Sequence, residues 1–522
     1  MTFRVLVVFG VLYTAQCTAH SFPPSFKFGA ATSAYQIEGA WNVSGKGLNI
    51  WDTFTHDSRN SVVDRSSGDI ACDSYHLWRK DVDLATELGL QFYRFSISWS
   101  RLLPTPFRNE IDEDGAAYYN NLINELLKRN IEPVITLYHY DLPQALQDFG
   151  GWLNPLIADW FASYAKVAYS LYADRVKTWL TINEPSILCD YIYNTGKLPP
   201  MIYEPMLAPY LCNKNVLLAH AKAWRIYDEE YKPIYKGRVS IANNPVWIEP
   251  ASPEYENLAE LAREFGAGRY SHPIYSQKGG WPPSVERHMA ELSKKQGYPE
   301  SRLPAFSIEE IELIRGTYDY YGLNHYTSRV IRSRQPGEQI GPWIFYGCPE
   351  LDAVLETPKS WPTTDADDVV MYPEGIRRQL EWLHQKYGNI TFLITENGCA
   401  SRGDDNDEDR IAFIKSYLEQ VSIAIKEGIN VEGYTVWSLM DNFEWLFGYK
   451  TKYGLYKVDF NDPQRRRTPR ASAHFYANII KARNTDVPTS QTPKRQEYHN
   501  HSNARSLHIN ILLLILFWLS VK

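Results

Sequence analysis

Two glutamates stand directly behind short apolar runs that have the composition of buried strands. Glu184 lies in Thr-Ile-Asn-Glu-Pro at 181–185, and Glu396 lies in Ile-Thr-Glu-Asn-Gly at 394–398. Two carboxyl groups at strand ends can hydrolyse a glycosidic bond, because one protonates the leaving oxygen while the other attacks or stabilises the sugar. The pair therefore predicts glycoside hydrolysis, and the surrounding elements must bring both groups to one site.

The chain alternates strand-like and helix-like segments. Short apolar runs bounded by turn residues predict eight strands, at 26–33, 91–99, 133–139, 176–183, 238–243, 318–326, 390–396 and 433–439. Helical patterns lie between them, at 73–88, 118–129, 157–172, 307–314 and 375–386. This order predicts an α/β fold, a single (β/α)8 TIM barrel with its active site at the C-terminal ends of the strands. Because the chain exceeds the ~250 residues of a minimal barrel, we expect long loops at those ends.

Polar and aromatic residues occupy the predicted strand ends. A single histidine or tryptophan is more often a core residue, but barrel strands end at one rim, so a whole series there indicates a binding site. The series is Gln36, Arg94, His139, Asn183, Glu184, Asn324, Tyr326, Glu396 and Trp437.

Composition narrows the choice of partner. The 522 residues are 44% hydrophobic and 22% charged with a net charge of -7, which fits a folded enzyme and argues against a nucleic-acid partner. The basic run at 465–467 is interpreted as a solvated loop. No His or Cys cluster has metal-ligand spacing, so we expect neither a metal nor a cofactor. Nothing in the sequence predicts the oligomeric state.

Five motifs together resemble glycoside hydrolase family 1 β-glycosidases, and especially the secreted animal, insect-like β-glucosidases. They are Phe-Gly-Ala-Ala-Thr-Ser-Ala-Tyr-Gln-Ile-Glu-Gly at 28–39, Tyr-Arg-Phe-Ser-Ile-Ser-Trp at 93–99, the two glutamate motifs, and Trp-Ser-Leu-Met-Asp-Asn-Phe-Glu-Trp at 437–445. The similarity extends from about Phe22 to Arg483.

The resemblance implies a role for each matching residue. Glu184 would be the general acid/base and Glu396 the nucleophile of a retaining, double-displacement mechanism. The sugar hydroxyls would be bound by Gln36, His139, Asn183, Glu444 and Trp445, with Trp437 beneath the sugar ring. We expect Arg94 to keep Glu396 ionised, Tyr326 to orient it within the substrate pocket, and Asn324 to support the site. The charge of Glu396 should keep Glu184 protonated.

Three positions depart from the family pattern. The segment 190–200 differs from the usual Gly-Tyr and Ala-Pro-Gly sequence, so the leaving-group preference is open. Tyr140 stands where Trp is commoner, and Cys399 stands where a bulky residue is frequent. We expect none of them to contact the catalytic pair.

Three functions are compatible with this pattern. The leading one is a retaining β-glucosidase for small β-glycosides or oligosaccharides, with tolerance for galactose or fucose left open. The second is a thioglucosidase, myrosinase-type, acting on glucosinolates. Plant thioglucosidases of the family carry Gln at the acid position, so Glu184 weighs against that version but not against an independently evolved one. The third is a catalytically silent sugar-binding protein, which the retention of both glutamates disfavours.

The N-terminal residues predict secretion. Arg4 precedes an apolar run at 5–13 and small residues at 17–19, which is typical of a signal peptide spanning 1–19, followed by the glycosidase domain at 20–485. In a secreted protein the sequons at Asn42, Asn389 and Asn500 are candidate glycosylation sites. Of the five cysteines that remain, we expect Cys189 to pair with Cys212, Cys348 to pair with Cys399, and Cys72 to be buried and free.

The C-terminal residues predict a second targeting segment. A polar linker at 486–506 precedes a hydrophobic tail at 507–522, which is shorter than the ~20 residues of a membrane-spanning helix. It fits either a GPI-attachment signal, with small residues at 502–504, or a plain hydrophobic tail. The expected location is therefore extracellular, with a cell-surface GPI anchor as the alternative.

Overall fold

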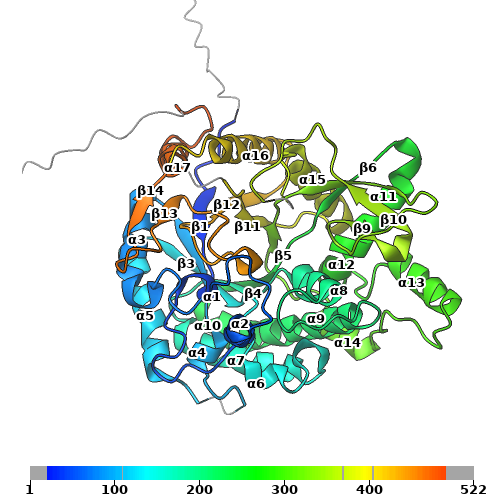
Figure 1. Ribbon diagram of the computed structural model, residues 1–522, viewed down its shortest axis with the longest axis horizontal. Helices are drawn as coiled ribbons and strands as arrows, with labels where there is room; N and C mark the ends of the chain where they lie inside the picture. The colour runs from blue at the N-terminus through cyan, green and yellow to red at the C-terminus, as the bar shows by residue number, and fades with distance from the viewer. Residues whose placement is uncertain (1–19, 108–109, 367–368, 402–404, 489–522) are drawn as a thin grey trace, which may run out of the picture. The chain divides into compact units, whose positions relative to one another are not determined.

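A closed barrel of parallel strands lies at the centre of the protein (Figure 1). The computed structural model describes residues 20–107, 110–366, 369–401 and 405–488, which belong to one structural unit. Within these ranges eight strands close the barrel in the order in which they occur along the chain. They are β1 (Lys27–Ala31), β2 (Phe92–Ser96), β3 (Glu132–Tyr138), β4 (Thr178–Asn183), β5 (Arg238–Asn243), β7 (Tyr321–Asn324), β11 (Phe392–Asn397) and β12 (Val431–Trp437). The predicted (β/α)8 barrel is confirmed, and each predicted run overlaps one of these strands.

Helices surround the strands (Figure 1). Those of seven residues or more are α2 (Ile50–His56), α3 (Ser74–Leu88), α5 (Glu113–Lys128), α7 (Ile157–Tyr172), α9 (Ala208–Ile226), α11 (Glu256–Arg263), α12 (Arg269–Tyr275), α13 (Pro283–Lys295), α14 (Ile308–Ile314), α15 (Glu374–Tyr387), α16 (Glu408–Lys426) and α17 (Ala471–Ala482). The five predicted helices are confirmed as α3, α5, α7, α14 and α15, and the expected capping box of Ser307 with Glu310 opens α14.

Shorter elements fill the loops. They are the α-helical turns α1 (Ala34–Ile37), α4 (Trp99–Leu102), α6 (Gln144–Gln147), α8 (Ile192–Thr195) and α10 (Lys232–Tyr235), the 3-10 turns Gly151–Leu153, Pro253–Tyr255, Pro349–Leu351 and Trp445–Phe447, and the π turns Ile187–Tyr191, Tyr227–Tyr231 and Glu264–Gly268. A sheet of β6 (Trp247–Pro250), β8 (Ser328–Ser333), β10 (Ala353–Glu356) and β9 (Gly347–Cys348) and the pair β13 (Tyr456–Val458) and β14 (Arg467–Pro469) complete the fold. The sequence did not predict these strands, because most are too short to show a period.

Side chains from five barrel strands, together with Tyr320 just before β7, form a hydrophobic cluster of their own, as expected for the filled interior of a TIM barrel. The cluster contains Phe92, Val134, Leu180, Ala242, Tyr320 and Leu393. Gly29 of β1 leaves room for it, since a Cβ there would lie 2.3 Å from the Phe92 ring. The polar residues at the ends of the same strands therefore rest on a packed floor.

The cysteine pairing is only partly as expected. Cys189 is joined to Cys212, which ties the π turn after β4 to α9 and confirms the first predicted disulfide. Cys348 and Cys399 are each buried and free, so their predicted pairing is wrong. Cys348 lies in β9 of the small sheet, whereas Cys399 follows barrel strand β11, so their elements belong to separate sheets. Cys72 is buried and free, as predicted.

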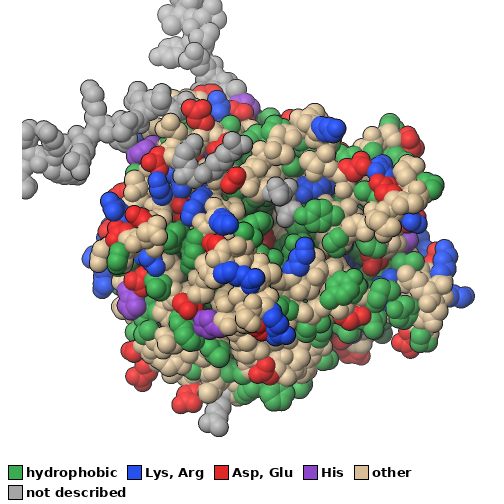
Figure 2. All heavy atoms as spheres, viewed as in Figure 1, with side chains coloured by type: hydrophobic (Ala, Val, Ile, Leu, Met, Phe, Trp, Pro, Cys, Tyr) green, Lys and Arg blue, Asp and Glu red, His purple; other side chains and the backbone are tan. Residues whose placement is uncertain are grey.

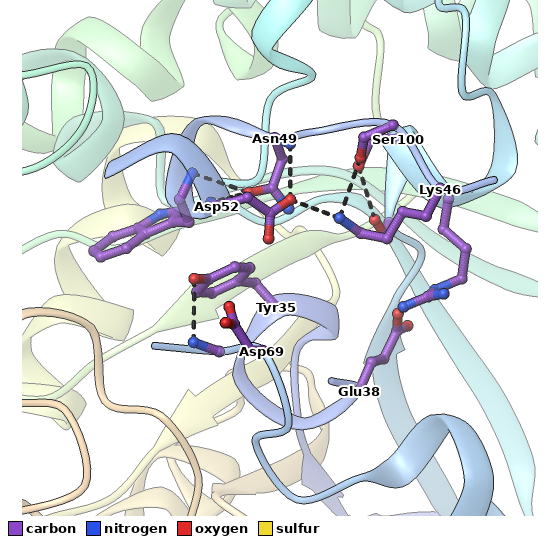
Figure 3. Close-up of polar contacts among 12 residues, drawn as sticks. Tyr35, Glu38, Lys46, Asn49, Asp52, Asp69 and Ser100 are labelled. Atoms are coloured by element: carbon purple, nitrogen blue, oxygen red, sulfur yellow. Dashed lines mark hydrogen bonds and ion pairs between the residues drawn. The ribbon is translucent and has the colours of Figure 1, made fainter. Parts of the chain in front are cut away.

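A buried polar cluster shapes the segment between β1 and α2 (Figure 3). Lys46 Nζ lies 2.7 Å from Asp52 Oδ2, and the side chain of Asn49 accepts hydrogen bonds from the amides of residues 51 and 52 at the start of α2. Tyr35 from the same segment stacks on Trp445, with ring centroids 6.4 Å apart. The cluster therefore supports Tyr35, which in turn packs behind Trp445, a residue of the candidate site.

The described surface carries charges of both signs. Figure 2 shows Lys and Arg side chains interspersed with Asp and Glu side chains over the viewed face. Asn42 and Asn389 of the predicted sequons are exposed. No described helix has both the length and the apolar character to cross a membrane. Several predicted features lie outside the described residues. They are the signal peptide (1–19), the hydrophobic tail (507–522), Asn500 and all but the first three residues of the linker.

One buried ion pair holds the loop after β12. Arg470, which precedes α17, donates two hydrogen bonds to Asp441, Nη1 to Oδ1 at 3.0 Å and Nη2 to Oδ2 at 2.8 Å, and both side chains are buried. Arg470→Met would leave Asp441 as an uncompensated buried charge, which costs about 3–5 kcal/mol. We expect a loss of that size in the free energy of unfolding measured by urea denaturation.

The control for this prediction is Lys457→Met, which breaks a solvent-exposed pair with Asp405. Exposed pairs contribute little, so we expect a change within about 0.5 kcal/mol. Equal, small effects of the two substitutions would show that the Arg470 pair does not stabilise the loop.

Candidate active site

A cavity of about 620 Å³ lies at the C-terminal ends of the barrel strands. Glu184 follows β4 directly, Glu396 lies near the end of β11, and both line the cavity. The other predicted site residues that line it are His139, Asn324, Tyr326, Trp437, Glu444 and Trp445. The two glutamates, far apart in the sequence, therefore share one site.

A larger hollow of about 940 Å³ lies beside the segment 449–470. Neither predicted glutamate lines it. Among the Lys and Arg residues that line it, Lys457, Arg466 and Arg470 each lie within salt-bridge distance of an aspartate. Across the part of the chain that the structure describes, no group of three or more His, Cys, Asp or Glu residues is arranged to hold a metal ion. The pair of acids therefore singles out the smaller cavity.

Glu396 accepts hydrogen bonds on both carboxylate oxygens. Arg94 Nη1 donates to Oε1 at 2.5 Å, and Tyr326 Oη donates to Oε2 at 2.6 Å. Arg94 and Glu396 are 1% and 3% exposed, so this charge-assisted bond is shielded from water. Burial and the charge of Glu396 raise the pKa of Tyr326 well above its ordinary value, so its hydroxyl stays protonated and donates. This environment suits an ionised carboxylate.

Glu184 has a different environment. Asn324 Nδ2 donates to Oε1 at 2.9 Å, and Tyr140 Oη donates to Oε2 at 2.5 Å. Burial, followed by the charge of Glu396, raises the pKa of Glu184 to about 7, although these two hydrogen bonds act in the opposite direction. A carboxyl group with a pKa near neutrality can both donate and accept a proton, so Glu184 suits acid/base work.

A hydrogen-bond network beneath the cavity links the carboxyl groups of Glu184 and Glu396. Asn183 Oδ1 accepts from Arg94 Nη2 at 2.6 Å and from Asn324 Nδ2 at 3.1 Å. Thr395, next to Glu396, donates its hydroxyl to Asn324 Oδ1 at 2.6 Å. Arg94 and Asn183 therefore support the cavity from below, and both are buried. Because every member comes from a barrel strand, the strand register sets the relative positions of the acids.

Three aromatic rings form one wall. The His139 ring stacks on Trp437 and on Trp445, at centroid distances of 5.7 and 6.1 Å. Burial and the nearby Arg94 charge lower the pKa of His139 well below its ordinary value, so the ring is neutral. Its Nδ1 has no hydrogen-bond partner among the described residues. The wall combines flat apolar faces with a polar atom available to a ligand.

Glu444, in the loop after β12, is the third carboxyl group of the cavity. Burial raises its pKa to about 8, and the charges of Glu396 and Glu184 act in the same direction. Within the described ranges, Glu444 Oε2 has no hydrogen-bond partner. A carboxyl group in this state can donate a hydrogen bond to a ligand hydroxyl or accept one from it.

Gln36 is not among the residues that line the cavity. Its Nε2 donates to Asn442 Oδ1 and to the carbonyl of Phe443, both at 2.9 Å, and its Oε1 accepts from Ser33 at 2.6 Å. In this structure Gln36 therefore anchors the loop that carries Glu444, and its predicted contact with a sugar stays a prediction.

Tyr140 corrects one expectation. We expected none of the departures from the family pattern to contact the catalytic pair, yet Tyr140 donates directly to Glu184. The prediction was wrong because the chain turns sharply after β3, where Tyr140 has a φ of 71°. Its position one residue after His139 was the available signal.

The outer part of the cavity is mainly apolar. Its lining includes Val63, Ile187, Tyr191, Leu198, Val246, Phe345, Tyr346, Val369, Leu446 and Phe447. Val63 and Tyr346 are 55% and 46% exposed, as expected of residues at an open mouth. Lys197 is the one Lys or Arg among the cavity-lining residues that the structure describes, and it belongs to the segment whose sequence departs from the family. Apart from that segment, no residue of this apolar wall was predicted from the sequence.

Comparison with known proteins identifies relatives along almost the whole domain. The model of Glycosyl hydrolase family 1 matches residues 18–485. Myrosinase 1 of Brevicoryne brassicae is 44% identical over 467 residues, covering 88% of this chain and 98% of that protein. The cytosolic β-glucosidase of Homo sapiens is 40% identical over 467 residues, with coverages of 88% and 98%. Among solved structures, a rice β-glucosidase in a covalent complex with glucose has a TM-score of 0.80 and 34% identity, and the match covers 88% of this chain and 98% of that one.

The raised pKa of Glu444 makes stability depend on pH. Below about pH 4.5, its ordinary pKa, Glu444 is protonated in the folded and unfolded states alike. Between pH 4.5 and 8 only the folded state keeps the proton, so unfolding releases it and the wild type loses stability as pH rises. Glu444→Gln has no such proton. We expect it to raise the melting temperature by about 1–3 °C more at pH 8 than at pH 4.5.

Glu291→Gln on the exposed face of α13 is the control and should show no pH-dependent gain. Equal melting-temperature shifts for Glu444→Gln at the two pH values would contradict the assigned environment of Glu444.

Proposed function

Because the chain belongs to glycosyl hydrolase family 1, we propose that it cleaves β-D-glucosides with retention, using Glu396 as nucleophile and Glu184 as acid/base. One observation carries the assignment of roles. Two carboxyl groups share a cavity, but Glu396 is bonded to a buried guanidinium while Glu184 has a pKa raised to about 7. The ionised group suits attack on carbon, and the other suits proton transfer.

In the first half-reaction, Glu396 attacks the anomeric carbon while Glu184 gives its proton to the glycosidic oxygen. The leaving group departs as an alcohol, and the sugar stays bound to Glu396. Esterification removes the charge of Glu396, which is one of the causes that raise the pKa of Glu184. Glu184 therefore ionises more readily once the covalent intermediate has formed.

In the second half-reaction, water attacks the same carbon and Glu184 accepts its proton, which releases the sugar with its original configuration. Arg94 and Tyr326 regain the carboxylate of Glu396 as hydrogen-bond acceptor. The pair returns to its starting protonation states, and no other reactant is needed.

The inner residues of the cavity fit a single sugar ring. We assign Trp437 to its apolar face, and His139, Glu444 and Trp445 to its hydroxyls. Asn183 Nδ2 has two N–H groups and faces His139 Nε2 at 3.2 Å, which leaves one N–H for the 2-hydroxyl. Glu444, with its unpaired Oε2, supports recognition of glucose hydroxyls remote from the scissile bond.

Thioglucoside hydrolysis is the second candidate. Two observations favour it: the similarity to a protein named myrosinase, and Lys197 in the cavity lining, where it could meet the sulfate of a glucosinolate. Glu184 favours O-glucosides, because an oxygen leaving group needs the proton that a thio-linked one can do without. The O-glucosidase is therefore the leading proposal, with the thioglucosidase as a substrate variant on the same catalytic pair.

The function is tested with five substrates: an aryl β-glucoside, an aryl β-galactoside, cellobiose, a cyanogenic glucoside and a glucosinolate. We expect the highest kcat/KM on O-linked β-glucosides. Glu396→Gln should abolish turnover with an unchanged melting curve. Glu184→Gln should lower kcat/KM for cellobiose by about 10²–10⁴-fold but spare 2,4-dinitrophenyl β-glucoside, whose leaving group needs no proton.

Exposed Glu291→Gln serves again as the control and should retain wild-type rates. Turnover by folded Glu396→Gln would overturn the nucleophile assignment. Inactivity of the wild type on all five substrates would favour a sugar-binding protein, and a preference for the glucosinolate would favour the thioglucosidase.

We also propose that the protein is secreted and attached to the cell surface by a GPI anchor, on the basis of its terminal segments. Treating intact expressing cells with a phosphatidylinositol-specific phospholipase should release the protein into the medium. Detection of the 507–522 peptide in the mature protein by mass spectrometry would contradict the anchor. Recovery of the 1–19 peptide in the mature protein would contradict secretion by the predicted signal.

A further inference from the structure

Tyr140 lies at the centre of the proton-transfer apparatus. It is 5% exposed and packs edge-on against His139 and Trp445, with centroid distances of 5.3 and 5.4 Å. Its hydroxyl donates to Glu184 Oε2 at 2.5 Å. The ring is thus held on both sides while the hydroxyl contacts the carboxyl group that must gain and lose a proton.

The two oxygens of Glu184 have chemically different partners. Oε1 faces an amide N–H of Asn324, which can only donate, and the carbonyl of that amide already accepts from Thr395. A proton on Oε1 would therefore oppose the Asn324 N–H. Oε2 faces a hydroxyl group, which can donate or accept. A proton on Oε2 can be donated in a hydrogen bond to Tyr140, whereas a proton on Oε1 would find no acceptor in Asn324.

We propose that Tyr140 is a positioning residue for proton transfer, whose hydroxyl accepts a hydrogen bond from Glu184 Oε2–H when Glu184 is the acid and donates one when Glu184 is the base. The inference rests on the proposed acid/base role of Glu184.

Every proton is accounted for as the hydrogen bond between Glu184 and Tyr140 changes direction. In the resting acid form, the Glu184 proton is shared with Tyr140 Oη. It then goes to the glycosidic oxygen as the C–O bond breaks, and the Tyr140 hydroxyl turns to donate to the new carboxylate. When water attacks, its proton goes to Oε2 and the Tyr140 hydroxyl turns back. Tyr140 keeps its own proton throughout.

The surroundings of Tyr140 favour that behaviour. Burial and the charge of Glu184 raise the pKa of Tyr140 well above its ordinary value, so the hydroxyl does not ionise. The charges of Glu396 and Arg94 change the pKa of Glu184. The charge of Glu184 in turn raises the pKa values of Glu444 and Tyr326. Adjacent His139 is neutral, because burial lowers its pKa. Among these groups, Tyr140 is the hydroxyl bonded directly to Glu184.

The residue type matters because Trp is commoner at this position in the family that the sequence resembles. An indole N–H donates but cannot accept. A tryptophan could therefore donate to Glu184 through this contact but could not accept the proton of its acid form. Tyr140 gives this chain a partner suited to both half-reactions.

The test compares the wild type with Tyr140→Phe, using Tyr169→Phe as a matched control. Tyr169 is also buried, and its hydroxyl has no hydrogen-bond partner among the described residues. Tyr140 bonds both forms of Glu184, but its hydrogen bond to the charged carboxylate is the stronger one. Tyr140→Phe should therefore raise the pKa of Glu184 and move the alkaline limb of kcat/KM for cellobiose from near pH 7 to about 0.5–1 unit higher. Titration of ¹³C-labelled glutamate by NMR, with the Glu184 signal assigned by its loss in Glu184→Gln, should show the same shift without substrate.

A second readout separates positioning from folding. For 2,4-dinitrophenyl β-glucoside, whose release needs no acid, we expect Tyr140→Phe to keep kcat/KM within about twofold but to lower kcat about tenfold, because hydrolysis of the covalent intermediate needs an oriented base. A general packing defect would lower both. Tyr169→Phe should change neither quantity.

The outcomes distinguish the two proposals. An unchanged Glu184 titration in Tyr140→Phe overturns the role of Tyr140, whether or not the enzyme is active. If the Glu184 titration differs between the wild type and Tyr140→Phe while neither protein hydrolyses any of the five substrates, that result overturns the proposed function but not the role of Tyr140. If Tyr140→Phe does not fold, Tyr140→Trp supplies the test: wild-type pH dependence there would show that accepting a hydrogen bond is not required.

Discussion

The buried guanidinium of Arg94 is the interaction on which the catalytic geometry depends. From β2 it donates to Thr136 of β3 at 3.0 Å, to Asn183 of β4 at 2.6 Å and to Glu396 of β11 at 2.5 Å. A buried cation is tolerated only when its charge is paired and its N–H groups are bonded. Of these strands only β3 pairs with β2, so Arg94 reaches its partners on β4 and β11 across the interior of the closed barrel. Closure of the barrel and assembly of the acid pair are therefore a single structural event.

The same charge explains why the two glutamates differ. Among the described residues, the cavity is lined by three carboxyl groups, those of Glu184, Glu396 and Glu444, and Arg94 donates a hydrogen bond to Glu396. Burial disfavours charge on the other two, so Glu184 and Glu444 have pKa values raised to about 7 and about 8. The nucleophile is thus specified by the position of one arginine. Glu184 is suited to be the proton donor because no arginine is hydrogen-bonded to it among the described residues. The two glutamates have identical side chains, so their different roles come from these different surroundings.

Sequence alone predicted the barrel because strand ends and apolar runs are local signals, and it predicted Glu184 and Glu396 because each follows such a run. The small sheet of β6, β8, β9 and β10 was missed, since strands as short as two residues carry no period. Glu444 was reached only through the family motif, because its carboxyl joins the cavity by way of an irregular loop. The contact of Tyr140 was missed for a related reason: a residue after a strand end can turn toward or away from the cavity, and no sequence pattern fixes that choice.

Backbone strain supports this view of the loops. Tyr140, Glu184 and Trp445 have φ values of 71°, 44° and 51°, in a region that non-glycine residues avoid, and all three line the cavity. Such conformations cost of order 1–3 kcal/mol each and persist only where the surroundings enforce them. Here the enforcement is visible: the Glu184 amide donates to the carbonyl of Ala242, and Trp445 stacks on Tyr35 beside the buried Lys46–Asp52 pair. The chain accepts strain at the residues that face the substrate because the packed barrel and the polar cluster behind it supply the opposing stability.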